Sequence, residues 1–217
     1  MIPRFPVYLF DIDGTLLDSA QDICGAIQHV LAGPQAGGRA APSKQVTFDY
    51  LKGFIGYHLI DLFLDLFPEH SPDQVNGLIQ EYRTTYLARG HRSTKVYTGV
   101  AEGLAVLGGR KSTATTKGTP TTRAVLEQFG LIRFFDHVQG TDGIPCKPAP
   151  DVVLAALAAL EAEPGDCLFV GDSPADMEAG RRAGVKTCAV SYGYGKREEL
   201  AKWNPDYWVS DLRALAQ

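Results

Sequence analysis

Short apolar runs alternate with amphipathic segments over much of the chain. The runs at residues 7–10, 167–170 and 187–190 are each followed closely by a polar or glycine residue. Runs of this length are typical of strands that are buried on both faces of a sheet. Because a helical pattern follows each run, the sequence predicts an α/β fold with a parallel sheet.

A fourth strand and several further helices complete this prediction. The strand is expected at residues 111–115, where small polar side chains indicate either tight packing or a locally weakened sheet. Helix-start and helix-stop residues such as Pro120 and Gly130 define the helices. These helices are expected at residues 98–107, 119–130, 150–160 and 175–183.

The alternation of strands and helices is interrupted between residues about 19 and 95. A helical pattern with one apolar face, residues 23–31, is followed by a loose tract at residues 34–42. The segment 59–67 is strongly apolar, and Ser71 begins another helix with the signature of a capping box. The sequence therefore predicts a helical insert near the start of the α/β core.

The length of the chain agrees with this division. At roughly 150 residues per domain, 217 residues correspond to one main core and a smaller lobe. We predict a three-layer, doubly wound, Rossmann-like parallel sheet for residues 1–18 and 96–217, and an inserted α-helical domain for residues 19–95. A hydrophobic fraction of 45% and a charged fraction of 21% exclude disordered, collagen-like and coiled-coil classes.

Charge and cysteine content narrow the partners and the compartment. With Lys+Arg 21 against Asp+Glu 25, the net charge of −4 gives no general attraction to nucleic acid or to anionic lipid. The apolar stretch before Asp11 is too short for a signal peptide or a membrane span. The four cysteines form no C-x-x-C pair. We expect a cytoplasmic protein with no nucleic-acid or membrane partner, either a monomer or a small homo-oligomer.

Two carboxylates, Asp11 and Asp13, follow the first predicted strand and precede Gly14. In an extended chain, residues i and i+2 point to the same side, so the two acids would converge. The carboxyl end of a central strand is where open α/β sheets bind ligands. Paired carboxylates repel each other unless a cation lies between them, and oxygen ligands suit Mg²⁺. An isolated pair of this kind could equally cap a helix and form a turn.

A second acidic element, containing Asp172 and Asp176, follows the predicted strand at residues 167–170. Taken alone, Asp172 could simply cap the next helix. Parallel strands, however, end at the same edge of a sheet, which would gather Asp11, Asp13 and Asp172 there. Because three carboxylates without a counter-ion are costly, the sequence predicts a divalent cation that keeps water and a substrate phosphate in its coordination shell.

A phosphate also needs positive charge and neutral hydrogen-bond donors. Lys147 lies just before a predicted helix, and Thr115 ends the polar strand. Either residue could contact an anion at the same edge of the sheet. Taken alone, a Lys-Pro pair is typical of a solvated surface, and a threonine in a strand has no functional meaning.

Together these residues resemble the four ordered motifs of the haloacid dehalogenase superfamily. The resemblance spans nearly the whole chain, and the presence of all four motifs makes it specific. The motif residues are Phe10-Asp11-Ile12-Asp13-Gly14-Thr15-Leu16, Thr115, Lys147-Pro148, and Val170-Gly171-Asp172-Ser173 with Asp176.

This resemblance implies a role for each motif residue. Asp11 would be the nucleophile that becomes an aspartyl-phosphate, and Asp13 would be the general acid/base. Mg²⁺ would be bound by Asp11, Asp172 and the main-chain carbonyl of Asp13, with Asp176 supporting these ligands. The transferring phosphoryl oxygens would be held by Thr115, Thr116 and Lys147.

The helical insert resembles the cap domain of this superfamily, which closes over the site and reads the substrate. Residues 18–23 and 97–100 look most like the phosphoglycolate phosphatase branch. Two positions depart from that branch: Thr116 stands where an Asn is common, and Ile60 stands near the position of a common Arg. The missing arginine argues against phosphoglycolate itself, so we expect a phosphoglycolate-like compound or a sugar phosphate as the substrate. His58 or Lys52 could replace the arginine, although a solvated or structural role is expected for each.

The motif residues favour phosphatase activity over the rival activities of this superfamily. Dehalogenation and phosphonate cleavage are disfavoured because those branches generally lack an acid at the position of Asp13. A sugar phosphomutase of the β-phosphoglucomutase type uses the same core, but its relatives carry a His where this chain has Ile23. A non-catalytic phosphate-binding or interaction module would not need the intact motif residues. We therefore expect a Mg²⁺-dependent phosphatase that acts on a small phosphorylated metabolite.

Overall fold

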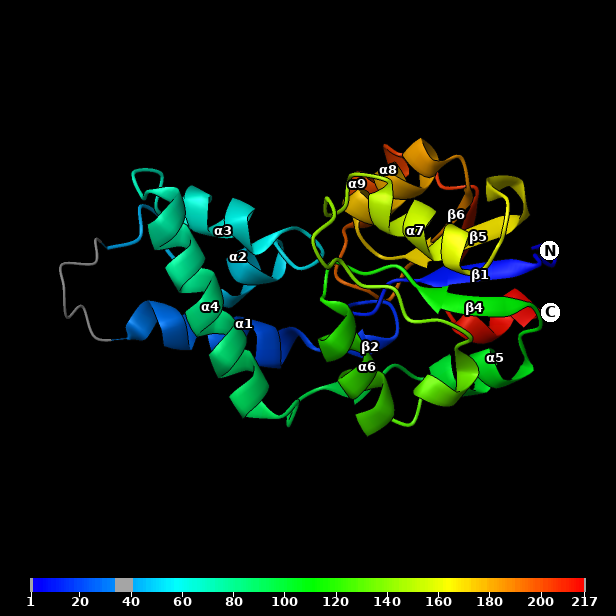
Figure 1. The fold of residues 1–217 in the computed structure, drawn as a ribbon, viewed down its shortest axis with the longest axis horizontal. Coiled ribbons are helices and arrows are strands. Elements are labelled where there is room, and N and C mark those ends of the chain that lie inside the picture. The colour runs from blue at the N-terminus through cyan, green and yellow to red at the C-terminus, as the bar shows by residue number, and fades with distance from the viewer. Residues whose placement is uncertain (1, 34–40, 217) are drawn as a thin grey trace. The chain divides into compact units, whose positions relative to one another are not determined.

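The computed structural model of the protein describes residues 2–33 and 41–216 (Figure 1). The chain divides into two compact units. The first unit, which we call the core unit, consists of Met1–Asp18 and Lys95–Gln217. The second, the inserted unit, consists of Ser19–Thr94. The insertion therefore interrupts the core unit shortly after its first strand.

A parallel sheet forms the centre of the core unit. Its strands are β1 Val7–Phe10, β4 Arg110–Thr113, β5 Cys167–Gly171, β6 Lys186–Val190 and β7 Tyr207–Val209. These five strands of the described residues run parallel in the order β4-β1-β5-β6-β7. The α/β fold with a parallel sheet is therefore confirmed. The pattern of apolar runs did not predict β7, which has only three residues.

Helices cover both faces of this sheet (Figure 1). They are α5 Val100–Val106, α6 Thr119–Gln128, α7 Asp151–Ala159, α8 Pro174–Ala183 and α9 Arg197–Ala201, with 3-10 turns at Ile132–Phe134, Pro164–Asp166 and Leu212–Ala216. Val7 and Leu9 of β1 share a buried cluster with α7 and α8, whereas Tyr8 and Phe10 share another with α5 and α6. Because alternate residues of a strand point to opposite faces, β1 is buried on both sides and the core unit has three layers.

The inserted unit is helical in its described residues. Its helices are α1 Ala20–Ala32, α2 Phe48–Lys52, α3 Leu59–Leu66 and α4 Pro72–Arg89. The predicted capping box is present, because the side chains of Ser71 and Gln74 each accept a main-chain N–H of the other residue. Most of the loose tract predicted at residues 34–42 falls on residues 34–40, which lie outside the described residues.

A short ribbon connects the two parts of the core unit. It pairs β2 (Leu17–Asp18) with β3 (Lys95–Val96) in antiparallel fashion. The inserted unit begins directly after β2 and ends directly before β3. This ribbon therefore contains both points at which the chain leaves and re-enters the core unit.

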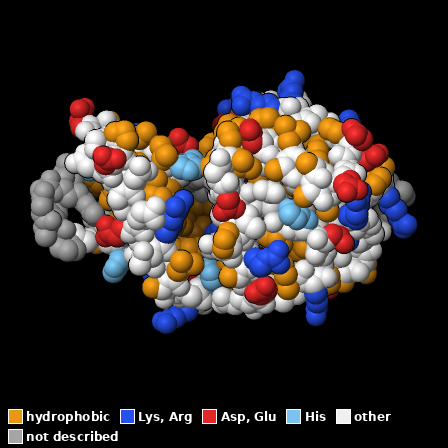
Figure 2. Space-filling view, viewed as in Figure 1, with side chains coloured by type: hydrophobic (Ala, Val, Ile, Leu, Met, Phe, Trp, Pro, Cys, Tyr) orange, Lys and Arg blue, Asp and Glu red, His pale blue; other side chains and the backbone are white. Residues whose placement is uncertain are grey.

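Charged groups of both signs lie on the surface. In Figure 2, Lys and Arg side chains are interspersed with Asp and Glu side chains and with hydrophobic atoms over the face shown. This distribution agrees with the small net charge of −4. Along residues 2–33 and 41–216, no helix combines the length and the apolar character needed to cross a membrane.

Candidate active site

Three neighbouring strands bring the predicted site residues to one edge of the sheet. Asp11 directly follows β1, Asp172 directly follows β5, and Thr115 lies two residues after β4. In the parallel register, Phe10 pairs with Thr113 on one side and with Val170 on the other. The carboxyl ends of all three strands therefore coincide, as the sequence predicted.

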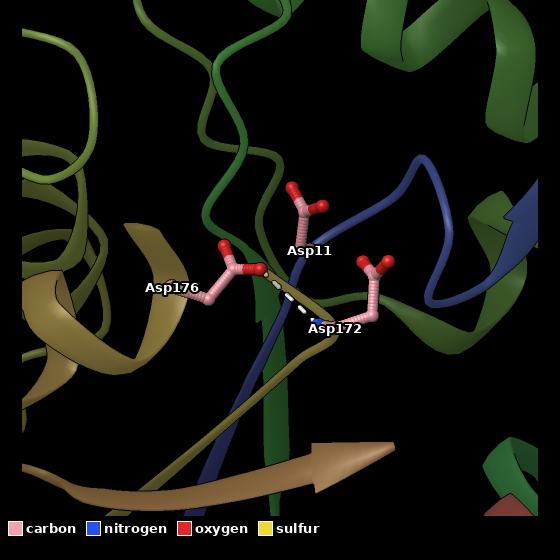
Figure 3. Close-up of side chains that lie close together, drawn as sticks. All are labelled: Asp11, Asp172 and Asp176. Atoms are coloured by element: carbon pink, nitrogen blue, oxygen red, sulfur yellow. Dashed lines mark hydrogen bonds between the residues drawn. The ribbon is translucent and has the colours of Figure 1, made fainter. Parts of the chain in front are cut away.

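Three buried carboxylates form the centre of this edge. Asp11, Asp172 and Asp176 each offer an oxygen that lies within 4.8 Å of the others. Figure 3 shows Asp11 and Asp172 extending from the segments after β1 and β5, and Asp176 from the first turns of α8. Burial raises the pKa of Asp11 to about 6, against the opposing charge of Lys147. Burial, together with the charges of Asp176 and Asp11, also raises the pKa of Asp172.

Lys147 is the cation of this cluster. Its side chain is fully buried, and its Nζ lies 2.6 Å from Asp11 Oδ1 and 2.6 Å from Asp176 Oδ1. Burial alone would lower the pKa of Lys147, but the charges of the two carboxylates outweigh burial, so the pKa is raised. Lys147 is therefore a charged group at the site, 136 residues away from Asp11 in sequence.

Both carboxylate oxygens of Asp176 accept hydrogen bonds. Its Oδ1 accepts from Lys147, and its Oδ2 accepts from the main-chain N of Asp172 at 3.1 Å, which Figure 3 draws as a dashed line. The same Oδ2 accepts from the main-chain N and the Oγ of Ser173, at 2.9 and 2.7 Å. Because both oxygens are occupied, Asp176 is suited to orienting Lys147 and the segment after β5 rather than to binding a metal.

The Asp172 carboxylate is held by two donors that sequence reasoning missed. The Thr15 hydroxyl donates to Oδ1 at 3.1 Å, and the main-chain N–H of Tyr194 donates to Oδ2 at 2.7 Å. Thr15 belongs to the first motif, so its position was a usable signal. The Tyr194 donor is a backbone group, and no residue type in the sequence indicates it.

A lysine that the sequence analysis did not select lies beside Asp13. Lys117 Nζ is 3.1 Å from Asp13 Oδ2, and the two side chains are only 9% and 13% exposed. Lys117 follows the predicted Thr115 by two residues, which is the signal that could have identified it. The site therefore contains a second cation, Lys117, next to Asp13, which is the second carboxylate of the first motif.

The two threonines after β4 complete the set of predicted residues. Thr115 is buried, and its Oγ1 accepts the main-chain N–H of Lys117 at 3.4 Å. Its carbonyl accepts the hydroxyl of Thr141 at 3.0 Å. Thr116, the next residue, is half-buried. These bonds fix the segment that carries both threonines at the same end of the sheet as Asp11.

Comparisons with known proteins identify the class of this fold and site. The family model described as "Haloacid dehalogenase-like hydrolase" matches residues 8–190. The chain belongs to the haloacid dehalogenase-like hydrolases, and the predicted family and its enzyme class are confirmed.

Individual relatives match over nearly their whole length. The chain is 34% identical to a phosphoglycolate phosphatase from Aquifex aeolicus, over 94% of this chain and 92% of that protein. It is 33% identical to the pyrophosphatase PpaX of Anoxybacillus flavithermus, over 95% and 93%. A haloacid dehalogenase-like family hydrolase from Streptococcus pneumoniae matches with a TM-score of 0.82 and 25% identity, covering 97% and 96% of the two chains. The first two of these relatives are named for different substrates.

Proposed function

We propose that this protein is a Mg²⁺-dependent phosphatase that hydrolyses a small phosphomonoester through an aspartyl-phosphate on Asp11. The observation that carries the proposal is the contact between Asp11 and Lys147 at 2.6 Å beside the buried Asp172. A carboxylate attacks an anionic phosphate only where the surrounding charges offset their repulsion. The names of the relatives, a phosphoglycolate phosphatase and a pyrophosphatase, also support phosphoester or phosphoanhydride chemistry.

The donor set of the site fits a magnesium ion. Asp11 and Asp172 are buried carboxylates with raised pKa values, which is the environment that a bound cation would relieve. Together with the main-chain carbonyl of Asp13, they offer only oxygen ligands, which Mg²⁺ prefers. When bound, the ion would neutralise charge on the substrate phosphate.

Asp11 and Asp13 have separate roles in the proposed reaction. An Asp11 oxygen attacks phosphorus, the bond between phosphorus and the ester oxygen breaks, and Asp13 gives a proton to the departing oxygen. In the second half, Asp13 takes a proton from a water molecule that attacks the aspartyl-phosphate. Inorganic phosphate leaves and the Asp11 carboxylate is regenerated.

The remaining site residues hold the phosphate. Lys147 and the segment carrying Thr115 and Thr116 would contact the phosphoryl oxygens. Asp176 keeps Lys147 in place through the bond at 2.6 Å. Loose phosphoryl transfer depends chiefly on such positioning and charge, so these groups are proposed to accelerate the reaction together with the nucleophile.

The inserted unit is proposed to be the cap that selects the substrate. Ile60, near the position of the arginine common in relatives, is 36% exposed on α3. His58 caps α3, because its Nδ1 accepts the main-chain N–H of Ile60 at 3.1 Å. We therefore assign His58 a structural role, and we propose a substrate such as a phosphoglycolate-like compound or a sugar phosphate.

The buried free thiols Cys24, Cys167 and Cys188 support a reducing, cytoplasmic compartment.

A substrate screen tests this proposal. Release of inorganic phosphate would be measured over several dozen phosphorylated metabolites, with Mg²⁺ and with EDTA. We expect hydrolysis that needs Mg²⁺ and that is lost in Asp11→Asn, while the exposed Asp166→Asn retains it. Equal activity of the wild type and Asp11→Asn would refute the proposal.

A further inference from the structure

The segment after β6 closely surrounds the Asp172 carboxylate. A Cβ placed on Gly193 would lie 2.3 Å from Asp172 Cβ and 2.6 Å from Asp172 Oδ2. A Cβ placed on Gly195 would lie 2.0 Å from the carbonyl oxygen of Asp172. Both distances are far below van der Waals contact. The two glycines therefore allow the backbone of residues 193–195 to approach Asp172 more closely than any other residue type would.

This approach brings a hydrogen-bond donor to the carboxylate. Between the two glycines, the main-chain N–H of Tyr194 donates to Asp172 Oδ2 at 2.7 Å. The opposite oxygen, Oδ1, accepts from the Thr15 hydroxyl at 3.1 Å. Hydrogen bonds are directional, so one donor on each oxygen restricts the rotation of the carboxylate group.

The two tyrosines of the segment are themselves anchored to the core unit. The Tyr192 hydroxyl donates to the carbonyl of Thr15 at 2.8 Å, and the Tyr194 hydroxyl donates to Asp18 Oδ1 at 3.0 Å. The Tyr192 ring also packs on Tyr97, with 4.8 Å between centroids. The segment is therefore tied both to the motif that follows β1 and to the β2–β3 ribbon.

We infer that residues 192–195 form a positioning element for Asp172, in which the Tyr194 amide and the two tyrosine hydroxyl anchors set the orientation that this carboxylate presents to Mg²⁺. The inference rests on the proposed function, because it takes Asp172 as a metal ligand. None of the four residues needs to touch the substrate. They act by orienting Asp172. Loss of a group that hydrogen-bonds to a metal ligand typically weakens metal affinity about 10- to 100-fold.

Two variants separate the parts of this element. Gly193→Ala forces the segment away from Asp172 and removes the amide donor from its place. The double variant Tyr192→Phe, Tyr194→Phe removes both hydroxyl anchors and keeps the amide. Tyr8→Phe is the matched control, because it removes a tyrosine hydroxyl that accepts the Phe5 N–H at 2.9 Å, away from the site.

The readout is the Mg²⁺ dissociation constant, measured calorimetrically without substrate on the full-length protein. We expect Gly193→Ala to bind Mg²⁺ about 10- to 100-fold more weakly, the double variant to bind it several-fold more weakly, and Tyr8→Phe to bind it like the wild type. A folded Gly193→Ala with wild-type affinity overturns the inference. If that variant does not fold, wild-type affinity in the double variant overturns it instead.

Failure of the proposed function has a different signature. A wild-type protein that binds no Mg²⁺ would refute that function and the inference with it, whereas a wild type that binds Mg²⁺ but hydrolyses no phosphomonoester would refute the function alone. A wild type that binds Mg²⁺ and is active, together with variants of unchanged affinity, would refute the inference alone.

Discussion

Lys117 lies beside Asp13, with 3.1 Å between the lysine Nζ and the carboxylate Oδ2. The pair is mostly buried, so solvent screens it less than a surface ion pair. Asp13 is the proposed general acid/base, and Lys117 fixes a positive charge and a donor next to it. The proposed substrate is an anion, so the same charge also favours its approach.

Replacement of Lys117 tests the importance of this pair. Lys117→Met removes the charge while keeping an unbranched side chain, and we expect kcat/KM for the preferred phosphomonoester to fall about 10- to 100-fold, the value of one charged hydrogen bond. Steady-state kinetics measures this loss. Lys202→Met, which removes an exposed lysine paired with Glu199, is the control and should leave kcat/KM unchanged. Unchanged kinetics in Lys117→Met would contradict a role for the pair.

Asp13→Asn separates proton transfer from metal binding. The substitution removes the acid/base, so phosphoenzyme formation and breakdown should both slow, by about 10²- to 10⁴-fold. The proposed metal ligand at this position is the main-chain carbonyl, which the substitution keeps, so Mg²⁺ affinity should stay within a few-fold of the wild type. Rapid-quench kinetics and calorimetry measure the two properties. Loss of Mg²⁺ binding would show that the side chain itself is needed for the metal.

Asp11→Asn should abolish activity, and the stability of the metal-free variant relative to the wild type should improve as the pH rises. The folded-state pKa of Asp11 is raised to about 6 from 3.8, mainly by burial, so the folded state holds this proton more tightly than the unfolded chain does. As the pH rises from about 4 through 6, the group therefore lowers the free energy of unfolding, by up to about 3 kcal/mol above pH 6. Asparagine does not titrate and avoids this loss, and Lys147 keeps its contact with Asp176 at 2.6 Å.

Thermal unfolding in EDTA at pH 5 and pH 7.5 checks this expectation. The melting temperature of Asp11→Asn relative to the wild type should be more favourable at pH 7.5 than at pH 5. The exposed Asp166→Asn should show no such dependence on pH. A difference that shrinks as the pH rises would mean that Asp11 is stabilised in its charged form.

The fold was predictable because its strands are short apolar runs with strong boundaries. β1, β5 and β6 occupy the predicted runs, and the parallel register then places Asp11 and Asp172 at one edge. β7 could not be predicted from periodicity, because three residues are too few to show a period. β7 forms because it pairs with β6, and this pairing depends on the tertiary fold.

The site was predictable where a residue type carries the chemistry, and less so where geometry does. The family resemblance placed Lys147 at the site as a phosphate-binding residue, but its contact with Asp11, across 136 positions, was not predicted. Lys117 has a long side chain whose direction the sequence does not determine. The Tyr194 amide is a main-chain donor that every residue except proline has, so only the fold brings it to Asp172.

In the inserted unit, the buried carboxylate of Asp22 pairs with a partly exposed arginine and accepts two hydrogen bonds, which should support the stability of this unit. Asp22 of α1 accepts from the Ser93 N–H at 2.9 Å and the Thr94 hydroxyl at 2.8 Å, and Arg89 lies 3.4 Å from its other oxygen. Asp22→Ala leaves the buried Thr94 hydroxyl and the Ser93 N–H without this acceptor, so we expect the free energy of unfolding to fall by about 1–3 kcal/mol. Urea unfolding measures this change.

The control for this prediction is Asp73→Ala, in the exposed first turn of α4. It removes only a favourable interaction with the helix dipole, which is worth about 0.3–1 kcal/mol. A loss in Asp22→Ala no greater than that in Asp73→Ala would mean that the pair contributes little to stability.

Asp176→Asn should destabilise the protein more than any other conservative change at the site. The carboxylate accepts four hydrogen bonds, one on Oδ1 and three on Oδ2, and all its donors are buried. Asparagine has one acceptor oxygen and a donor NH₂, so whichever way it turns, an NH₂ faces either Lys147 or the donors of Ser173. Breaking a buried pair in this way costs about 3–5 kcal/mol. Urea unfolding should show this loss, together with a lower kcat because Lys147 loses one of its two carboxylate partners. Stability within about 0.5 kcal/mol of the wild type, the range of ordinary surface substitutions, would mean that Asp176 does not hold the site together.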